Sequence, residues 1–326
     1  MSDDIDTGLE GFEPELETPD RDPAEDRGNP LARFPMPVLP DKPPSGLRYR
    51  RALRLREAVV TLGRSWQIVW GLIVRQLRTS YSQQVFGLWW TVMTPVAQLV
   101  VFTVVIHGVN SHGNGAGSKL LLSHGINTSV WLYVGLLGWT FYSGAVSTAS
   151  LSLVGNPLLN KVYAPREVFP LAQVATSGFD ALVSALILPI LLIVTMTNLS
   201  WSSIWSVMLP IAVMTIYAVA IALVASGLTV YARDVRSGIP IVMQLGLVMP
   251  GIVYPVSTAW KSVGMQSVYA VIFPVGAVND AIRNAMLLGK FPGGLPFWIA
   301  TAASCVYLVI CYGIFKRMET GFADVS

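Results

Sequence analysis

The residue types in this sequence that could carry out chemistry are few, and their spacing does not form a catalytic set. Its histidines flank or lie within a glycine-rich stretch, HGVNSHGNGAGSKLLLSHG, that contains no carboxylate or cysteine; they are His107, His112 and His124. A metal site there is conceivable, but solvated loop histidines are the more ordinary interpretation. Cys305 and Cys311 lie six residues apart in one apolar run and point to different faces of a helix, which indicates neither a disulfide nor a metal site.

The same stretch contains GNGAGSK, which superficially resembles a phosphate-binding loop. It lacks both the G-x-x-x-x-G-K-[ST] spacing and the strand that precedes such a loop. We therefore expect that this chain binds no nucleotide or other cofactor and is not an enzyme. Nucleic acid is a poor candidate partner too, because no reading module accompanies the basic residues. If the chain moves a solute against a gradient, the energy must come from a partner.

Two charged features lie within apolar surroundings. Asp180 is the one acid placed well inside an apolar run, with Ser177 three residues before it and Ser184 four residues after it. An acid inside a membrane is energetically expensive, so it is expected either to make structural hydrogen bonds or to line a substrate path. Asp280 and Arg283 are one helical turn apart, which predicts a local ion pair or, alternatively, a pair that faces a cavity and meets polar or anionic substrate.

Aromatic residues are concentrated near the ends of the apolar runs. Most are expected to lie at the membrane interface, where tryptophan and tyrosine are enriched. A minority that face a lumen could stack on sugar rings, whose C–H faces are apolar. The residues concerned are Trp89, Trp90, Trp131, Tyr133, Trp139, Phe141 and Tyr142.

The composition predicts an all-α membrane protein. Hydrophobic residues make up 53% of the chain, charged residues make up only 13%, and the mean hydropathy is +0.55, whereas roughly a quarter of the residues in soluble domains are charged. A helix of about 20 apolar residues spans the hydrocarbon core and satisfies its own backbone hydrogen bonds there. On that basis we expect six transmembrane helices, at about 88–108, 130–153, 171–197, 204–231, 238–256 and 295–315.

The residues before the first predicted span fall into two parts. Residues 1–45 are acidic and then proline-rich, which predicts a disordered cytosolic tail. Residues 46–82 begin with a block of arginines suited to anionic headgroups. They continue into RSWQIVWGLIVRQLRTSY, which predicts an amphipathic helix lying in the membrane surface. Its apolar arc consists of Trp66, Val69, Trp70, Ile73 and Leu77.

Positive charge predicts the orientation of the spans, because lysine and arginine favour cytosolic loops. With the N-terminus inside, the cytosolic segments contain the early arginines and the pairs Lys161 and Arg166, Arg233 and Arg236, and Lys316 and Arg317. Both termini are therefore expected in the cytosol, with residues 83–316 forming the membrane domain and residues 317–326 a short tail.

Two shorter segments do not fit the pattern of simple spans. Pro274 divides residues 257–294 into two helical patterns that are each too short to span, which predicts a re-entrant helical pair or, alternatively, a helical cap on the outer surface. The charged stretch NKVYAPREVFPLAQ, residues 160–173, lies between two predicted spans. Pro165 disfavours helix just before it and Pro170 can open the next helix, so the stretch either offers its charges to a partner or acts as a positive-inside anchor.

Four segments, in this order, resemble the permease subunit of type 2 ABC exporters, specifically the bacterial group that exports lipid-linked polysaccharides such as O-antigen, teichoic acid and galactan. The resemblance covers about residues 64–316. Gln76 departs from the family pattern, which has an acid there, and IFPVGAVND replaces a common asparagine–proline. The matching segments are VRQLRTSYSQQVFGLWWTVMTPVAQLVVFTVV (74–105), KVYAPREVFPLA (161–172), VYARDVRSGIPI (230–241) and IRNAMLLG (282–289).

This resemblance implies a homodimer in the bacterial cytoplasmic membrane that pairs with two copies of a separate ATPase, which would hold the ATP and Mg²⁺. The substrate implied is a polyprenyl-diphosphate-linked glycan, and residues 275–287 would shape the outer gate. The residues implied in contact with the ATPase are Arg75, Arg78, Tyr81, Lys161, Arg166, Glu167, Arg233 and Asp234. The residues suggested for the channel or gate are Trp89, Trp90, Trp139, Phe141, Tyr142, Asp180, Asp280 and Arg283.

Two other functions stay open. An ABC exporter of a drug or a simple lipid would have a smaller channel with fewer aromatic residues facing it. A membrane glycosyltransferase or acyltransferase, a more remote alternative, needs clustered acids or a histidine–acid pair at one membrane face. The three histidines and the dispersed acids of this sequence do not provide such a cluster.

Overall fold

The structure is a computed structural model, and its described residues belong to one compact unit within Ala52–Ser326. Several predictions fall outside the described residues: the tail 1–45, the arginine block up to residue 65, His124, Lys161 and Arg233. The structure describes residues 66–82, 88–112, 127–154, 165–196, 202–232, 234–252, 256, 260, 262–289 and 291–319.

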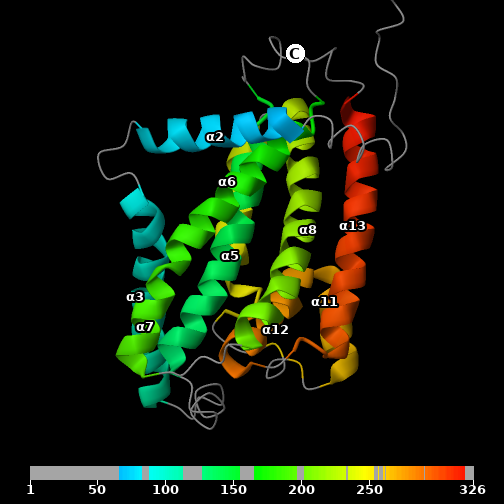
Figure 1. Ribbon diagram of the computed structural model, residues 1–326. Helices are drawn as coiled ribbons and strands as arrows, with labels where there is room; N and C mark the ends of the chain where they lie inside the picture. The colour runs from blue at the N-terminus through cyan, green and yellow to red at the C-terminus, as the bar shows by residue number, and fades with distance from the viewer. Residues whose placement is uncertain are drawn as a thin grey trace, which may run out of the picture. The chain divides into compact units, whose positions relative to one another are not determined.

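The described residues are helical and contain no strand, which confirms the predicted all-α class (Figure 1). Five of the six predicted spans match helices whose ends lie within four residues of the predicted bounds, and the span over 238–256 does not. The helices in chain order are α2 (Trp66–Ser82), α3 (Leu88–His112), α5 (Thr128–Ser150), α6 (Val168–Ala185), α7 (Ile187–Thr195), α8 (Ser202–Tyr231), α9 (Val235–Leu245), a 3₁₀ turn η4 (Gly246–Val248), α11 (Val263–Ile272), α12 (Pro274–Leu288) and α13 (Leu295–Glu319).

Four of these elements are long and apolar enough to cross a membrane. They correspond to α3, the continuous pair α6 and α7, α8, and α13, and the number rises to five if the bent pair of α11 and α12 counts as one span. The chain is therefore a multi-pass helical membrane protein. The windows are Trp89–Ile106, Val168–Thr195, Trp205–Tyr231 and Leu295–Glu319.

Helix α5 is long enough to span at 23 residues, or about 34 Å, but its composition does not place it among the four candidate spans. Its sequence contains serine, threonine and glycine at many positions. The reason is its place in the bundle: α5 packs against α3, α6, α8 and α12, and Leu132, Tyr133 and Leu136 have no exposed surface. A helix that faces protein on most sides does not need a fully apolar surface.

The predicted span over residues 238–256 is not one continuous helix. Helix α9 has 11 residues, or about 16 Å, which is much less than the thickness of a hydrocarbon core of about 30 Å. The 3₁₀ turn η4 follows it, and then Pro250, which lacks an N–H, and Gly251, which has a φ of 67°. Pro250 and the left-handed backbone at Gly251 explain why the helix does not continue.

The sequence analysis predicted that Pro274 divides residues 257–294 into two helices, and the structure confirms a break at that residue. Helices α11 and α12 meet at Phe273 and Pro274 with a bend of 115°. Pro274 takes the first helical position of α12, where its missing N–H removes no helical hydrogen bond. Because α12 packs against α5, α8 and α13, with most of its side chains buried, it is an internal element of the bundle and not a cap on its surface (Figure 1).

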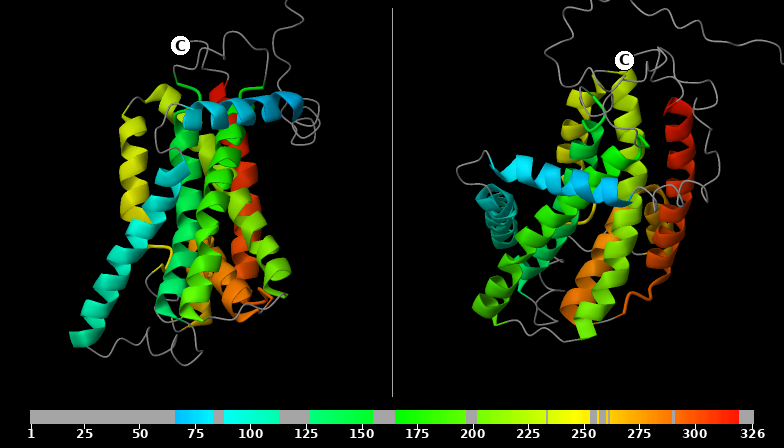
Figure 2. Two further views of the ribbon diagram at one scale, coloured as in Figure 1. Left: turned by 60° about the vertical axis from the view of Figure 1, so that its left-hand side comes forward. Right: turned by 45° about the horizontal axis from the view of Figure 1, so that its top comes forward.

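The predicted helix before the first span is present as α2. In Figures 1 and 2, α2 lies across the end of the bundle at which α6 begins and α13 ends. Its predicted apolar arc is divided: Val69 is buried, whereas Trp70 is 57% exposed. Placement of this helix in a membrane surface stays a prediction.

Candidate functional site

The start of α6 forms as the two prolines predicted. The N–H of Val168 donates to the carbonyl of Pro165 at 3.1 Å, and the N–H of Phe169 donates to that of Arg166 at 3.4 Å, which closes a turn ahead of the helix. Pro170 lies in the first turn, where backbone N–H groups have no helical partner. The charged residues before α6 are thereby held at one end of the bundle.

Glu167 does not project from this turn. Its carboxylate accepts a hydrogen bond of 2.8 Å from Nζ of Lys316 in α13, and the same ammonium donates to Glu319 at 2.8 Å. The side chains of both acids are 4% exposed and that of Lys316 is 13% exposed. The structure therefore corrects the exposed position expected for Glu167, because Lys316 holds its charge inside the chain.

The other residues implied in contact with an ATPase remain accessible in the described part of the chain. Arg78 and Asp234 are exposed, and Arg166 is half-buried. Figure 1 shows α2 and the start of α6 at the same end of the bundle; Arg78 belongs to α2, and Arg166 lies just before α6. Of the described charges in the segment before α6, Arg166 is half-buried and Glu167 is buried.

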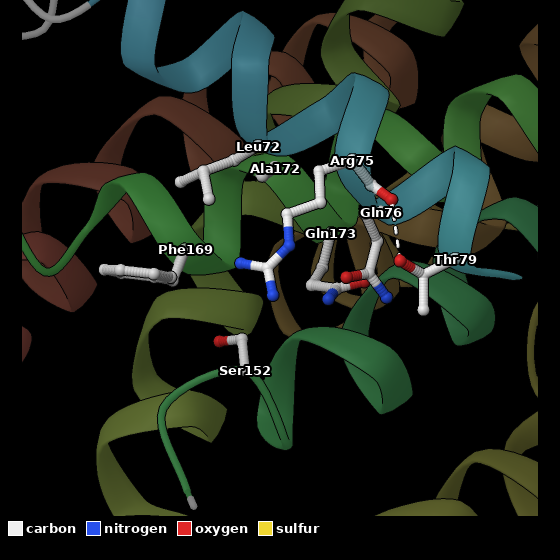
Figure 3. Close-up of a pocket in the computed structure, with 8 residues that line it drawn as sticks. All are labelled: Leu72, Arg75, Gln76, Thr79, Ser152, Phe169, Ala172 and Gln173. Carbon is white, nitrogen blue, oxygen red and sulfur yellow. Dashed lines mark hydrogen bonds between the residues drawn. The ribbon is translucent and has the colours of Figure 1, made fainter. Parts of the chain in front are cut away.

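A pocket of about 120 Å³ lies between α2 and α6 (Figure 3). Figure 3 shows the side chains of Arg75, Gln76 and Gln173 directed into it. Among the described residues that line the pocket there is no acid, so a polar or anionic group on a docking partner would suit it. The lining residues are Leu72, Arg75, Gln76, Thr79, Ser152, Phe169, Ala172 and Gln173.

Asp180 and Tyr81, which were predicted in separate roles, are bonded to each other. The hydroxyl of Tyr81 donates to Oδ1 of Asp180, and the Tyr81 ring meets the ring of Phe179 edge-on at 6.2 Å. Burial, and then the hydrogen bond to Asp180, raise the pKa of Tyr81 to about 12, so the phenol keeps its proton at neutral pH. Of the two roles considered for Asp180, the structure provides the structural hydrogen bond.

Asp280 and Arg283 form the predicted ion pair, with 3.2 Å between Nη1 and Oδ1. The guanidinium of Arg283 also donates to the carbonyls of Gly251 at 2.6 Å and Ile252 at 2.7 Å, and lies 4.8 Å from the ring centroid of Trp131. Asp280 accepts from the backbone N–H of Val256 at 2.7 Å.

The ion pair therefore provides hydrogen-bond partners for the irregular backbone that follows α9. Arg283 has no exposed surface, which corrects its predicted place in a channel wall: its own chain encloses it. Arg283 fits there because α5 has no side chain at Gly135, where an added Cβ would lie 1.8 Å from Nη2 of the arginine.

The aromatic residues predicted for the channel separate into two groups. Trp139 and Tyr142 are buried, each with 3% exposure, and Tyr142 stacks on Tyr217 with 5.5 Å between ring centroids. They belong to the core of the chain, which corrects their expected position on a channel surface. Trp89 and Trp90 are exposed at the start of α3, and Phe141 is half-buried.

Sequence reasoning missed three partners in this site. It did not connect Lys316 to Glu167, Tyr81 to Asp180, or Gly135 to Arg283, because each pair is separated by about 100 residues or more. Only the last had a local signal, since two glycines three residues apart, Gly135 and Gly138, are unusual in a helix that packs on protein.

Comparisons with known proteins agree with the helical architecture. The model of a family described as ABC-2 type transporter matches residues 67–287. The chain is similar to the O-antigen export system permease protein RfbA of Myxococcus xanthus, with 22% identity over 256 residues that cover 78% of this chain and 93% of that protein. A protein of the same description from Klebsiella pneumoniae is 22% identical over 258 residues, covering 77% and 92%.

We predict that Lys316→Met destabilises the fold. The change leaves two buried carboxylates without their cation, and breaking a buried ion pair in this way costs about 3–5 kcal/mol. Thermal unfolding in detergent should show a clearly lower midpoint for the variant than for the wild type. Arg236→Met is the matched control, because Arg236 is exposed and has no ion pair among the described residues. Equal midpoints for the two variants would contradict a stabilising role for the cluster.

We also predict that Gly135→Ala disrupts the Arg283 site while Gly144→Ala does not. Both positions lie in α5, but a Cβ at Gly144 would meet only Ser177, at 3.8 Å. The Gly135 variant must displace the guanidinium, and overpacking of this kind costs about 1–3 kcal/mol or more. Limited proteolysis between α9 and α12, together with the unfolding midpoint, provides the measurement. The prediction fails if Gly135→Ala and Gly144→Ala have the same unfolding midpoint and the same rate of proteolysis between α9 and α12.

Proposed function

The chain belongs to the ABC-2 type transporter family, and from this premise we propose that it is the membrane permease of a polysaccharide exporter. Its energy comes from a separate ATPase, and two copies of the chain together form the conduit. The observation that carries the proposal is the similarity to O-antigen export permeases over more than nine-tenths of their length. The substrate proposed is a glycan linked to a polyprenyl diphosphate in a bacterial cytoplasmic membrane.

The ATPase contact is proposed at the end of the bundle that contains α2, the start of α6 and the end of α13. Arg75 and Arg78 of α2, Arg166 before α6 and Asp234 before α9 supply accessible charge there. Positive charge favours the cytosolic side, so both termini face the cytosol in this proposal. An ATPase that binds α2 could seat an acidic side chain in the pocket beside Arg75.

The path for the glycan is proposed between two copies of the chain. Trp89 and Trp90 have large exposed aromatic surfaces, 58% and 61% of each residue, and can stack on sugar rings. In this proposal α3, α5, the α6–α7 pair, α8, α9 with the residues after it, and α13 provide the six crossings. The bent pair of α11 and α12 forms the outer gate.

Export of a drug or simple lipid is the competing function, and the exposed tryptophans distinguish it. Alanine at Trp89 and Trp90 should impair glycan export and should spare the transport of a small lipid. A membrane transferase would be recognised by turnover of purified chain without any ATPase.

We predict that the chain forms a stable complex with an ABC ATPase encoded beside it, with two copies of each subunit. Co-expression, purification and mass measurement test the complex. Lipid-linked glycan on the outer face, labelled in intact cells, tests the transport. An ATPase variant that binds but does not hydrolyse ATP is the control, and it should leave glycan on the inner face. Absence of any complex would overturn the proposal, as would normal glycan export after depletion of the chain.

We predict that Arg166→Glu uncouples the two subunits. The reversed charge at the proposed contact should reduce export severalfold while membrane insertion stays normal. Arg166→Lys keeps the charge and is the matched variant, so it should retain most of the export. Insertion and export are both measurable in the same cells by protease protection and glycan labelling. Loss of insertion by Arg166→Glu would instead assign Arg166 to anchoring.

A further inference from the structure

We propose that Tyr81 and Asp180 are positioning residues that tether α2 to α6, so that motion delivered to α2 reaches the membrane helices. This inference rests on the proposed function, because the motion originates in the ATPase. Neither residue needs to touch substrate for this role. The tether is the hydrogen bond from the Tyr81 hydroxyl to Oδ1 of Asp180, together with the edge-on contact of Tyr81 and Phe179.

Helix α2 packs against α6, with the pocket near the middle of α2 and the hydrogen bond to Asp180 near its end. Leu72 and Arg75 of α2 face Phe169 and Gln173 of α6 across the pocket. Nine residues further along α2 from Leu72, Tyr81 reaches Asp180, which is 11 residues beyond Phe169. These separations correspond to about 14 Å along α2 and about 16 Å along α6. The hydrogen bond of Tyr81 therefore adds a polar contact well along α2 from the pocket, and we expect it to limit the motion of α2 relative to α6.

The next turn of α6 holds the beginning of α3. Pro95 interrupts the helical hydrogen bonding of α3, because the carbonyl of Thr91 would normally accept from the N–H that residue 95 lacks. The hydroxyl of Ser184 shares its single hydrogen between this carbonyl, at 3.0 Å, and the carbonyl of Asp180, at 2.9 Å. Asp180 and Ser184 therefore hold the end of α2 and the beginning of α3 on adjacent turns of one helix.

The same face of α6 is bonded to α5, the central helix. The hydroxyl of Tyr133 donates to the carbonyl of Ser184 at 2.6 Å, and the hydroxyls of Thr148 and Ser177 lie 3.3 Å apart. A displacement of α2 is thus transmitted through Asp180 to a helix that is itself bonded to α3 and α5. Without the Tyr81 hydroxyl, α2 keeps its packing against α6 but loses its hydrogen bond to Asp180.

The first experiment measures the tether without any ATPase. A spin label at Val74→Cys, on the exposed side of α2, reports the mobility of this helix in lipid nanodiscs, with both native cysteines replaced by alanine. Tyr81→Phe and Asp180→Ala should increase the mobility. Asp180→Asn keeps an acceptor oxygen and should have a smaller effect. Tyr231→Phe is the matched control, because it removes a tyrosine hydrogen bond of 2.6 Å, to the carbonyl of Met318, at the same end of the bundle.

The second experiment measures coupling in the complex with the ATPase. Glycan exported per ATP hydrolysed should fall about fivefold in Tyr81→Phe, a size typical of changes along a coupling route, and should not change in Tyr231→Phe. Unchanged label mobility in Tyr81→Phe would overturn the tether. If Tyr81→Phe raises the mobility of the label but leaves the glycan exported per ATP unchanged, the role of the tether in coupling is overturned. If the wild-type complex shows no ATP-driven export, the proposed function fails, and with it the coupling role, while the mobility measurement still decides the contact.

Discussion

The absence of water in a membrane interior is the constraint on which this structure depends, because each backbone group that a helix does not satisfy needs another partner within the protein. At two of the places where helical hydrogen bonding is interrupted within the bundle, the chain supplies a side-chain donor. Ser184 donates to the carbonyl of Thr91, which Pro95 leaves without a helical donor. Arg283 donates to the carbonyls of Gly251 and Ile252 beyond α9.

The sequence predicted those features that depend on neighbouring residues. Hydrophobic length located α3, α8 and α13, Pro274 located the bend before α12, and the three-residue spacing of Asp280 and Arg283 predicted their ion pair. The predictions from sequence failed where a segment distant in the chain determines the burial or the backbone conformation of a residue. Glu167 was expected at the surface because nothing near it reveals Lys316, and the residues after α9 were expected to be helical because their composition is apolar.

Different polar interactions join the helices at the two ends of the bundle. At the end where α2 lies, an ammonium between two carboxylates joins α13 to the start of α6, and a tyrosine joins α2 to α6. At the other side of the bundle centre, a guanidinium joins α12 to the backbone after α9. Helix α5 contacts the elements of both groups, α6 as well as α12. It is therefore the structural link between the surface proposed for the ATPase and the pair proposed as the outer gate.

The space beside Gly135 of α5, which the guanidinium of Arg283 occupies, has a consequence for biogenesis. Both terminal nitrogens of Arg283 find acceptors within one chain, and the space they occupy is left open by Gly135 of the same chain. A single newly inserted copy can therefore complete this part of its structure before it meets a second copy. Arg283 therefore depends on no second copy of the chain for its acceptors or for the space that it occupies.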